Sequence, residues 1–413
     1  MLEKDHLLHP RLRPVEAFPV QMNNQDFICL RDPESFAEQP VFLNQTILFL
    51  VSRMDGNHSL RDIQADYYRS TGEILPIEDL EGLVLQLDEQ RYLDGPHFMS
   101  FYQSLIREFQ NSPSRPAHHA GSAYEGSREA LISQIQSFFA SPDGPGNHFS
   151  PDLSNPLRGL IAPHIDFTRG GPTYAHAYKA LTEHPGADTF IVFGTCHSPM
   201  SQRFSITGKD YETPLGTAKT DKDFVARISA KLQNRYSDEF SHRGEHSIEL
   251  QAVCLRYIFG DKQDFRIIPI LVGSFHDIHS EGRTAAADPE IQTVVNAVRE
   301  TINETQRRVC VIAGADLAHV GRRFGDASGP TEHSLREVER EDSIFLNLAA
   351  AGDAEGVFQS IAADNDRRRI CGYPPIYMAL RCIDRPDGKL LQYRQWSDLN
   401  AGAAVTYAAL AFF

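Results

Sequence analysis

The fold of this chain is decided by the stretch Ile161-Ala162-Pro163-His164-Ile165-Asp166-Phe167-Thr168-Arg169-Gly170-Gly171. An apolar run ends at His164, and the paired glycines allow a tight turn before a helical pattern over 173–181. A strand that ends at a histidine presents its imidazole at the carboxyl edge of a sheet, where open α/β folds bind ligands. The pattern recurs over 190–197, which ends at His197. We therefore predict that the two histidines converge at one edge of the sheet.

Apolar runs alternate with helical patterns from residue 118 onward. The strand-like runs occupy 159–162, 189–193, 265–272, 308–313 and 405–412. The helical patterns occupy 128–139, 173–181, 223–232, 247–258, 290–303 and 331–351. Such alternation is typical of an α/β domain. We predict a mixed, mainly parallel sheet flanked by helices.

Residues 1–112 are predicted to form a separate, small α+β domain. Helical patterns lie at 43–54, 60–71, 77–90 and 98–110, and strand-like segments lie at 25–31 and 91–95. The segment Asn111-Ser112-Pro113-Ser114-Arg115-Pro116 is rich in helix breakers and predicts a linker, so the α/β domain is expected to span 117–413.

The composition argues against several classes of protein. The chain has 413 residues and a formal net charge of −15, whereas phosphate contact favours a basic surface, so neither nucleic acid nor an anionic membrane is an expected partner. No apolar run is long enough for a membrane span, and the polar segment 1–13 does not resemble a signal peptide. The six cysteines are scattered without a CxxC pair, which argues against a disulfide framework. We expect a cytoplasmic protein.

Four histidine clusters stand where apolar runs end or helices begin. They read APHID at 162–166, GTCHS at 194–198, GEHSIE at 244–249 and GADLAH at 314–319. Each histidine taken alone has a simpler explanation as a hydrogen-bonded structural residue. Imidazole is nevertheless the commonest transition-metal ligand, and strand ends of one sheet share a crevice. Two or three histidines with a carboxylate would suit Fe(II), Zn or Cu and leave a coordination position open for substrate.

Eight motifs, in family order, resemble the Memo family, whose fold is similar to that of the class III non-heme-iron extradiol dioxygenases. The motifs are HAGSAY (119–124), IAPH (161–164), FGTCH (193–197), EHSIE (245–249), IPILVG (268–273), DLAH (316–319), ICG (370–372) and VTYAA (405–409). They extend over one whole domain. The segment from 54 to 94 resembles a PqqD-like winged-helix domain, which recognises peptides, although a helical cap on the second domain is the other interpretation.

The resemblance to the Memo family implies where the metal ligands and the active-site histidine lie. Metal ligands fall on His164 and His197, and Fe(II) is the expected ion, with Cu or Zn as alternatives. The active-site histidine, an acid–base group in the related dioxygenases, falls on His246.

A third ligand, which is a cysteine in animal Memo proteins, falls on Ala318, and alanine cannot bind a metal. Asp316, His319, His119 or solvent is left to complete the site, and Asp316 and His319 join His246 as candidate catalytic residues. Cys371 either lines the pocket or only supports it.

Three functions remain open on the sequence alone. The first is a metal-dependent oxidoreductase, similar to the dioxygenases, that acts on a small molecule or a peptide. The second is a binding protein that recognises a peptide or phosphopeptide without catalysis. The third, implied by family context, is an accessory role beside a radical-SAM enzyme, because bacterial Memo-like proteins carry the name of the AmmeMemoRadiSam system (protein B).

Overall fold

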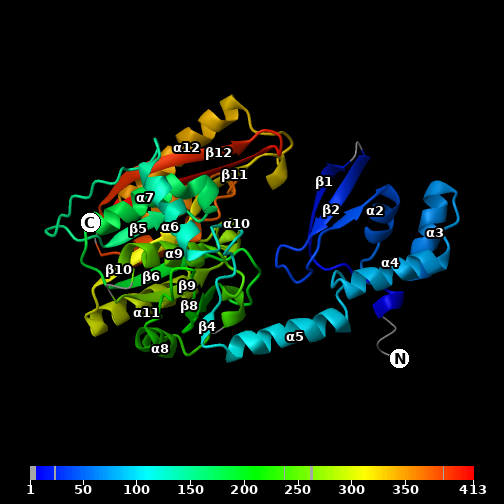
Figure 1. Cartoon of the computed structure of the whole chain (residues 1–413), viewed down its shortest axis with the longest axis horizontal. Helices are drawn as coiled ribbons and strands as arrows, with labels where there is room; N and C mark the ends of the chain where they lie inside the picture. The colour runs from blue at the N-terminus through cyan, green and yellow to red at the C-terminus, as the bar shows by residue number, and fades with distance from the viewer. Residues whose placement is uncertain (1–5, 23–24, 237, 261–263, 385) are drawn as a thin grey trace. The chain divides into compact units, whose positions relative to one another are not determined.

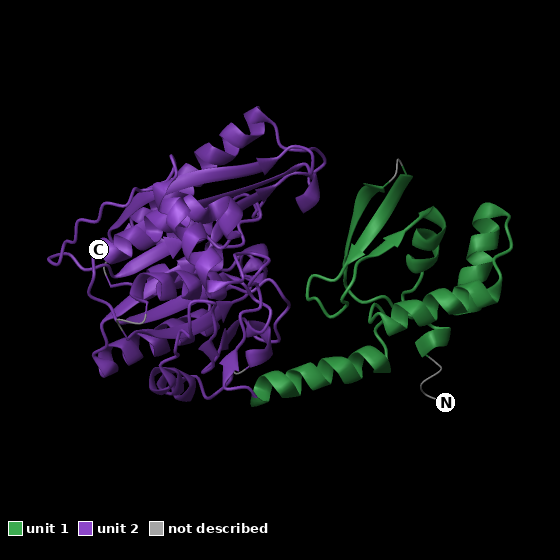
Figure 2. Cartoon of the chain, in the orientation of Figure 1, with its two compact units in different colours: residues 1–111 green, residues 112–413 purple. Residues whose placement is uncertain are grey.

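The computed structural model describes residues 6–22, 25–236, 238–260, 264–384 and 386–413. The chain divides into two compact units, residues 1–111 and 112–413 (Figure 2). The segment 111–116, predicted as a linker, lies at this division, but a helix ends at Asn111 and Ser114–Arg115 form a short strand with Arg115 buried. No helix within the described ranges is both long and apolar enough to cross a membrane.

The first unit combines a small sheet with helices. Its strands β1 (Glu16–Met22), β2 (Gln25–Arg31) and β3 (Val41–Leu43) form an antiparallel sheet in that order. The helices α2 (Gln45–Val51), α3 (Leu60–Thr71), α4 (Ile77–Glu89) and α5 (Pro96–Asn111) follow along the chain. The expectation of a strand at 91–95 is wrong, because Arg91 takes a positive φ of 65° and only Leu93 makes a single bridge, to Leu12.

An eight-stranded mixed sheet forms the centre of the second unit (Figure 1). The strand order is β11-β13-β5-β10-β6-β9-β7, with β12 paired to β13. The bounds are β5 (Gly159–Ala162), β6 (Thr189–Thr195), β7 (Phe204–Ile206), β9 (Arg266–Val272), β10 (Val309–Gly314), β11 (Asp316–Val320), β12 (Gly388–Asp398) and β13 (Ala403–Phe412). The strands β5, β10, β6 and β9 are parallel neighbours, whereas the others join antiparallel. The predicted mixed sheet flanked by helices is confirmed.

Helices cover both faces of this sheet, which explains why its parallel strands read as continuous apolar runs. Along β10, Cys310 and Ile312 pack with one group of helices, and Val311 and Ala313 with the other. The first group is α6 (Arg128–Ala140), α7 (Phe167–Glu183) and α9 (Ser247–Phe259). The second is α8 (Lys222–Lys231), α11 (Pro289–Thr305), α12 (Glu332–Ala350), α13 (Ala354–Ala362) and α14 (Tyr373–Cys382). Shorter elements are α10 (His276–Ser280) and a ladder of β4 (Ser114–Arg115) with β8 (Asp210–Tyr211).

Three glycines allow close approaches at the carboxyl edge of the sheet. A Cβ atom at Gly194 or at Gly314 would overlap Ser247, the first residue of α9. A Cβ atom at Gly372 would overlap the main chain at Asp316. The start of α9 therefore reaches the ends of β6 and β10, and the 371–372 turn reaches the start of β11, only because these glycines have no side chains.

Candidate metal centre

His164 is buried and held from two sides just after β5. Its backbone N–H donates to Asp316 Oδ1 at 2.9 Å, and its Nδ1 donates to the carbonyl oxygen of Gly314 at 3.0 Å. Burial lowers the pKa of His164 to about 3, so the ring is neutral. Because the proton sits on Nδ1, the Nε2 lone pair is left for a metal.

His197 follows β6 and is oriented by the buried carboxylate of Glu245. The His197 backbone N–H donates to Glu245 Oε2 at 2.9 Å, and Nδ1 donates to the same atom at 3.1 Å. Desolvation raises the pKa of Glu245, but His197 and His246 outweigh it and hold that pKa well below its usual value. The same carboxylate turns the Nε2 atom of His197 toward the site and keeps the pKa of His197 well above 6.5, against desolvation.

His246, directly before α9, contacts the same carboxylate. Its Nδ1 lies 3.2 Å from Glu245 Oε1, which also accepts the backbone N–H groups of His246 and Ser247 at 2.8 and 3.0 Å. Burial lowers the pKa of His246 well below 6.5 and the neighbouring imidazoles His197 and His164 add to this effect, although Glu245 opposes it. His246 is therefore a neutral imidazole.

The three imidazoles face one another, with ligand atoms all within 4.8 Å. The rings of His164 and His197 lie 5.0 Å apart at 82°, whereas those of His197 and His246 are stacked, 4.8 Å apart at 15°. His164 and His197, whose rings are nearly perpendicular, would hold the ion, and His246, stacked on His197, would lie beside it.

A thiol completes this corner of the site. Sγ of Cys371 lies 3.3 Å from Nε2 of His164, and the Thr195 hydroxyl donates to the Cys371 carbonyl oxygen at 3.2 Å. Burial raises the pKa of the Cys371 thiol, although His197 opposes the shift. The position expected to supply a thiol, Ala318, is instead a residue of β11 that is fully buried in the hydrophobic core. The thiol next to the two histidines therefore comes from the 370–372 turn.

Asp316 is the buried carboxyl group of the site. Its Oδ2 lies 3.8 Å from Nε2 of His164 while Oδ1 accepts the His164 backbone N–H. Burial raises the pKa of Asp316 to about 6, although His319 opposes the shift. A carboxyl group in this range can both give and take a proton near neutral pH.

The family model described as "Memo-like protein" matches residues 115–411. The chain belongs to the Memo family. It is 28% identical over 403 residues to a MEMO1 family protein of Aquifex aeolicus, a match that covers 97% of this chain and 99% of that protein. It is 30% identical over 303 residues to a MEMO1 family protein of Methanothermobacter thermautotrophicus, covering 72% and 99%. A MEMO1 family protein of Thermus thermophilus is 27% identical over 346 residues, covering 83% and 94%.

The family assignment extends to the whole second unit, and the Aquifex match also includes sequence of the first unit, since it leaves only a few per cent of either chain out. The family assignment predicted from the eight motifs is thereby confirmed. The PqqD-like character of the first unit and the link to a radical-SAM system stay predictions.

Two further histidines expected at the Memo site are engaged with the main chain. His119 places Nε2 2.7 Å from the Gly244 carbonyl oxygen, and its ring lies 5.5 Å from that of His246. His319 places Nδ1 3.0 Å from the Leu317 carbonyl oxygen, with its ring 5.1 Å from Phe324. Burial lowers the pKa of His319, whose ring interacts with Asp316. His119 therefore borders the cluster, and His319 lies on its Asp316 side.

The centre opens to solvent at His197, whose side chain is 39% exposed. A hollow of about 520 Å³ adjoins it, between the 196–203 loop and the end of β9. It is lined mainly by polar groups, among them Ser201, Gln202 and Glu290. A ligand would enter from this side.

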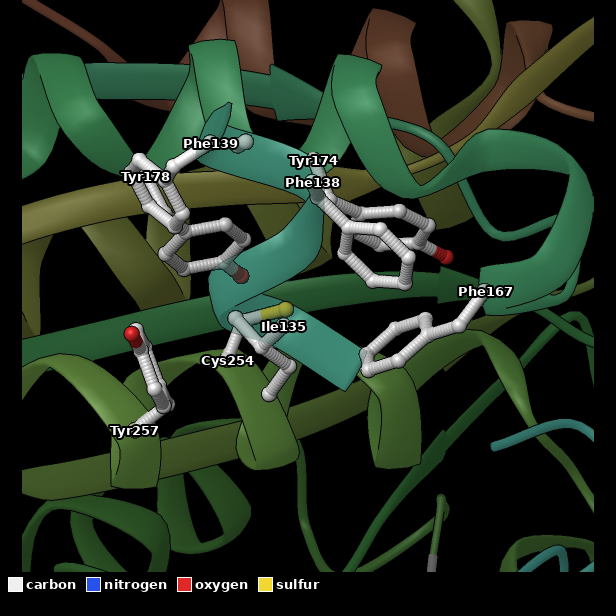
Figure 3. A pocket seen from close by; sticks show the side chains of 9 residues that line it. Ile135, Phe138, Phe139, Phe167, Tyr174, Tyr178, Cys254 and Tyr257 are labelled. Carbon is white, nitrogen blue, oxygen red and sulfur yellow. The ribbon is translucent and has the colours of Figure 1, made fainter. Parts of the chain in front are cut away.

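A second, much smaller cavity has no such role. A void of about 10 Å³ lies among α6, α7 and α9, where Figure 3 shows aromatic rings around Cys254. The space of one water with an apolar lining stays dry. Nearby, the Tyr178 hydroxyl donates to Gln251 Oε1 at 2.8 Å, and Gln251 Nε2 donates to the Pro163 carbonyl oxygen at 2.8 Å. Through Tyr178 and Gln251, this region supports the chain before His164.

From the sequence alone, Glu245 has no assigned role, and Cys371 either lines the pocket or only supports it. Glu245 directly precedes His246, but only the fold shows that it serves His197 as well. The neighbouring Gly372 was a signal for Cys371, because a glycine within a family motif indicates that the main chain approaches another segment closely. Here that segment is the main chain at Asp316.

Proposed function

We propose that the second unit binds a divalent transition metal through His164, His197 and Cys371 and works as a metal-dependent oxidoreductase on a small molecule or peptide. The observation that carries the proposal is the set of three donor atoms: Nε2 of His164 and Nε2 of His197, each on a ring whose Nδ1 is bonded to an acceptor, and one thiol beside them. Acceptors at Nδ1 are the usual support of metal-binding histidines.

The donor set fits the metals that the family resemblance implies. Two imidazoles and a thiolate suit Fe(II), Zn and Cu, and we propose Fe(II) in first place. Bound there, the metal would supply Lewis-acid chemistry and, as iron or copper, electron transfer. Three protein donors leave positions open toward the hollow beside His197.

The other residues are proposed to move protons and fix geometry. His246 is neutral and stacked on His197, so its Nε2 is proposed to take a proton from a ligand that enters beside His197. Asp316, with a pKa raised to about 6 by burial, is proposed to return a proton on the opposite side, together with His319. Glu245 stays ionised and holds both imidazoles.

A non-catalytic, peptide-binding role is the second candidate, because the first unit exposes apolar side chains. Phe18, Met22 and Phe42 on its small sheet are 36%, 43% and 42% exposed. A contiguous apolar face is a common feature of interaction surfaces. In that case the chain would serve as an accessory protein, and family context suggests a radical-SAM enzyme as the partner.

The two proposals differ in a direct assay. Protein loaded with Fe(II) under anaerobic conditions is mixed with oxygen and a panel of small diols and peptides, and oxygen uptake is followed. Substrate-dependent uptake that is lost in His246→Ala would support the oxidoreductase. Peptide binding that is equal with and without metal, with no uptake for any compound, would support the accessory role.

A further inference from the structure

Arg115 is a fully buried arginine in β4, at the start of the second unit. Its Nε donates to the carbonyl oxygen of His242 and its Nη2 to that of Glu245, both at 2.7 Å. Its Nη1 donates to the carbonyl oxygen of Pro116 at 2.9 Å and pairs with the Glu249 carboxylate. One guanidinium therefore joins the first turn of α9 to both ends of the loop at 242–245.

Residues near Arg115 in the chain also contact the loop at 242–245 and the Glu249 carboxylate. Nε2 of His119 lies 2.7 Å from the Gly244 carbonyl oxygen, and the His119 backbone N–H donates to Glu249 Oε1 at 3.0 Å. The Tyr124 hydroxyl donates to the same carboxylate. Burial raises the pKa of Glu249, but Arg115 outweighs it and the pKa stays below its usual value. The carboxylate is thus a charged anchor for the segment 115–124.

We infer that Arg115 is a positioning residue for the metal centre, acting through Glu245. The main chain of Glu245 is fixed by the guanidinium, and the side chain of the same residue orients His197 and His246. The position of two imidazoles thus depends on a residue that contacts neither of them. The inference rests on the metal-binding function proposed above.

The geometry of the contacts requires arginine. A planar guanidinium directs its N–H groups in fixed directions, so it spans two carbonyl oxygens and a carboxylate at once. A lysine at this position keeps the positive charge for Glu249, but its single ammonium cannot bridge His242 and Glu245. Arg115→Lys therefore preserves the ion pair and loosens the loop, which separates the effect of geometry from that of charge.

The test measures Co(II) binding under anaerobic conditions, by titration of the visible ligand-field and thiolate bands. Parent protein and Arg115→Lys are compared, and Arg13→Lys serves as the matched control. Arg13 is also a buried arginine, 6% exposed and paired with Asp32, but it lies in the first unit. Loss of support for metal-binding histidines typically weakens binding about 10- to 100-fold, which is the result expected for Arg115→Lys. Arg13→Lys is expected to bind as the parent does.

Thermal unfolding of the metal-free proteins shows whether each variant is folded. A folded Arg115→Lys with the parent's Co(II) affinity and spectrum would overturn the inference and leave the proposed function standing. If Arg115→Lys does not fold, His119→Phe decides, since it removes one contact to the loop at Gly244; parent-like affinity would then overturn the inference. A parent protein that takes up no Co(II), or a His164→Ala variant that binds it equally well, would overturn the proposed function and this inference with it.

Discussion

The thiol of Cys371 lies 3.3 Å from Nε2 of His164, although 207 positions separate the two residues along the chain. The contact joins the turn before α14 to the chain just after β5. The neutral Cys371 thiol donates to the lone pair on Nε2 of His164. Once the thiol proton is lost, the sulfur and this nitrogen would be neighbouring ligands of the proposed metal ion. The pair is therefore the core of the proposed metal centre.

Cys371→Ser should weaken the binding of Zn(II), because a hydroxyl is a far poorer ligand for this ion than a thiolate. Ala318→Cys should leave the affinity unchanged, because position 318 is fully buried in the core and its backbone N–H donates to the Thr406 hydroxyl. Competition against a chromogenic chelator measures both. Tighter binding by Ala318→Cys, with no loss in Cys371→Ser, would place the third ligand at 318 instead.

His246→Ala should keep the metal affinity of the parent, because the proposed ligands are His164, His197 and Cys371, whereas the ring of His246 is stacked on that of His197. Any turnover found for the metal-loaded protein should fall by about 100- to 10,000-fold, the usual contribution of a general base. Metal content by elemental analysis and the single-turnover rate are measured on the same sample. Loss of the metal in this variant would make His246 a ligand.

Metal affinity should rise with pH through the neutral range. Desolvation lowers the pKa of His197, but the Glu245 carboxylate outweighs it and raises that pKa well above 6.5. At neutral pH the metal must therefore displace a proton from His197 as well as the thiol proton of Cys371. Affinity should increase by up to about tenfold per pH unit for each proton displaced. In Glu245→Gln the pKa of His197 loses its support, so a pH profile that does not move would contradict this explanation.

Asp316→Asn should stabilise the metal-free protein at pH 8. Burial raises the pKa of Asp316 to about 6 from 3.8, so the folded state binds a proton more tightly than the unfolded state does. Stability is then lost as pH rises from about 4 to about 6, and the loss is complete above that range. A shift of this size corresponds to at most about 3 kcal/mol. Urea unfolding at pH 4 and pH 8 measures the free energy of unfolding of both proteins. An equal effect of the substitution at the two pH values would show that the raised pKa of Asp316 is not the cause.

The parallel strands and the long helices could be predicted from the sequence, because their buried positions are apolar residues in continuous runs or at helical spacing. The runs at 159–162 and 189–193 appear as β5 and β6, and the pattern at 247–258 appears as α9. Strand β12 was not predicted, because its side chains are largely half-buried or exposed and its polar residues hide the pattern. Strand β11 has no separate signal in the sequence, because only Ala315 separates it from β10.

The convergence of His164 and His197 was predictable from the residues themselves, because each stands two residues after a strand, β5 or β6. The parallel register of β5 and β6 on either side of β10 brings them together. The roles of Cys371 and Arg115 could not be predicted in this way. The contact of Cys371 with His164 depends on how a turn packs, and the contact of Arg115 with Glu245 depends on how a two-residue strand packs. No local pattern states which distant residue such a segment will meet.

The central claim is that His164 and His197 hold one metal ion, and anaerobic calorimetric titration with Fe(II) tests it most directly. We expect one ion per parent chain, no binding in His164→Ala, and one ion in His333→Ala, a control at an exposed histidine on α12 whose side chain is 79% exposed. Fe(II) binding by His164→Ala with the affinity and stoichiometry of the parent would contradict the account, because the metal would then lie elsewhere.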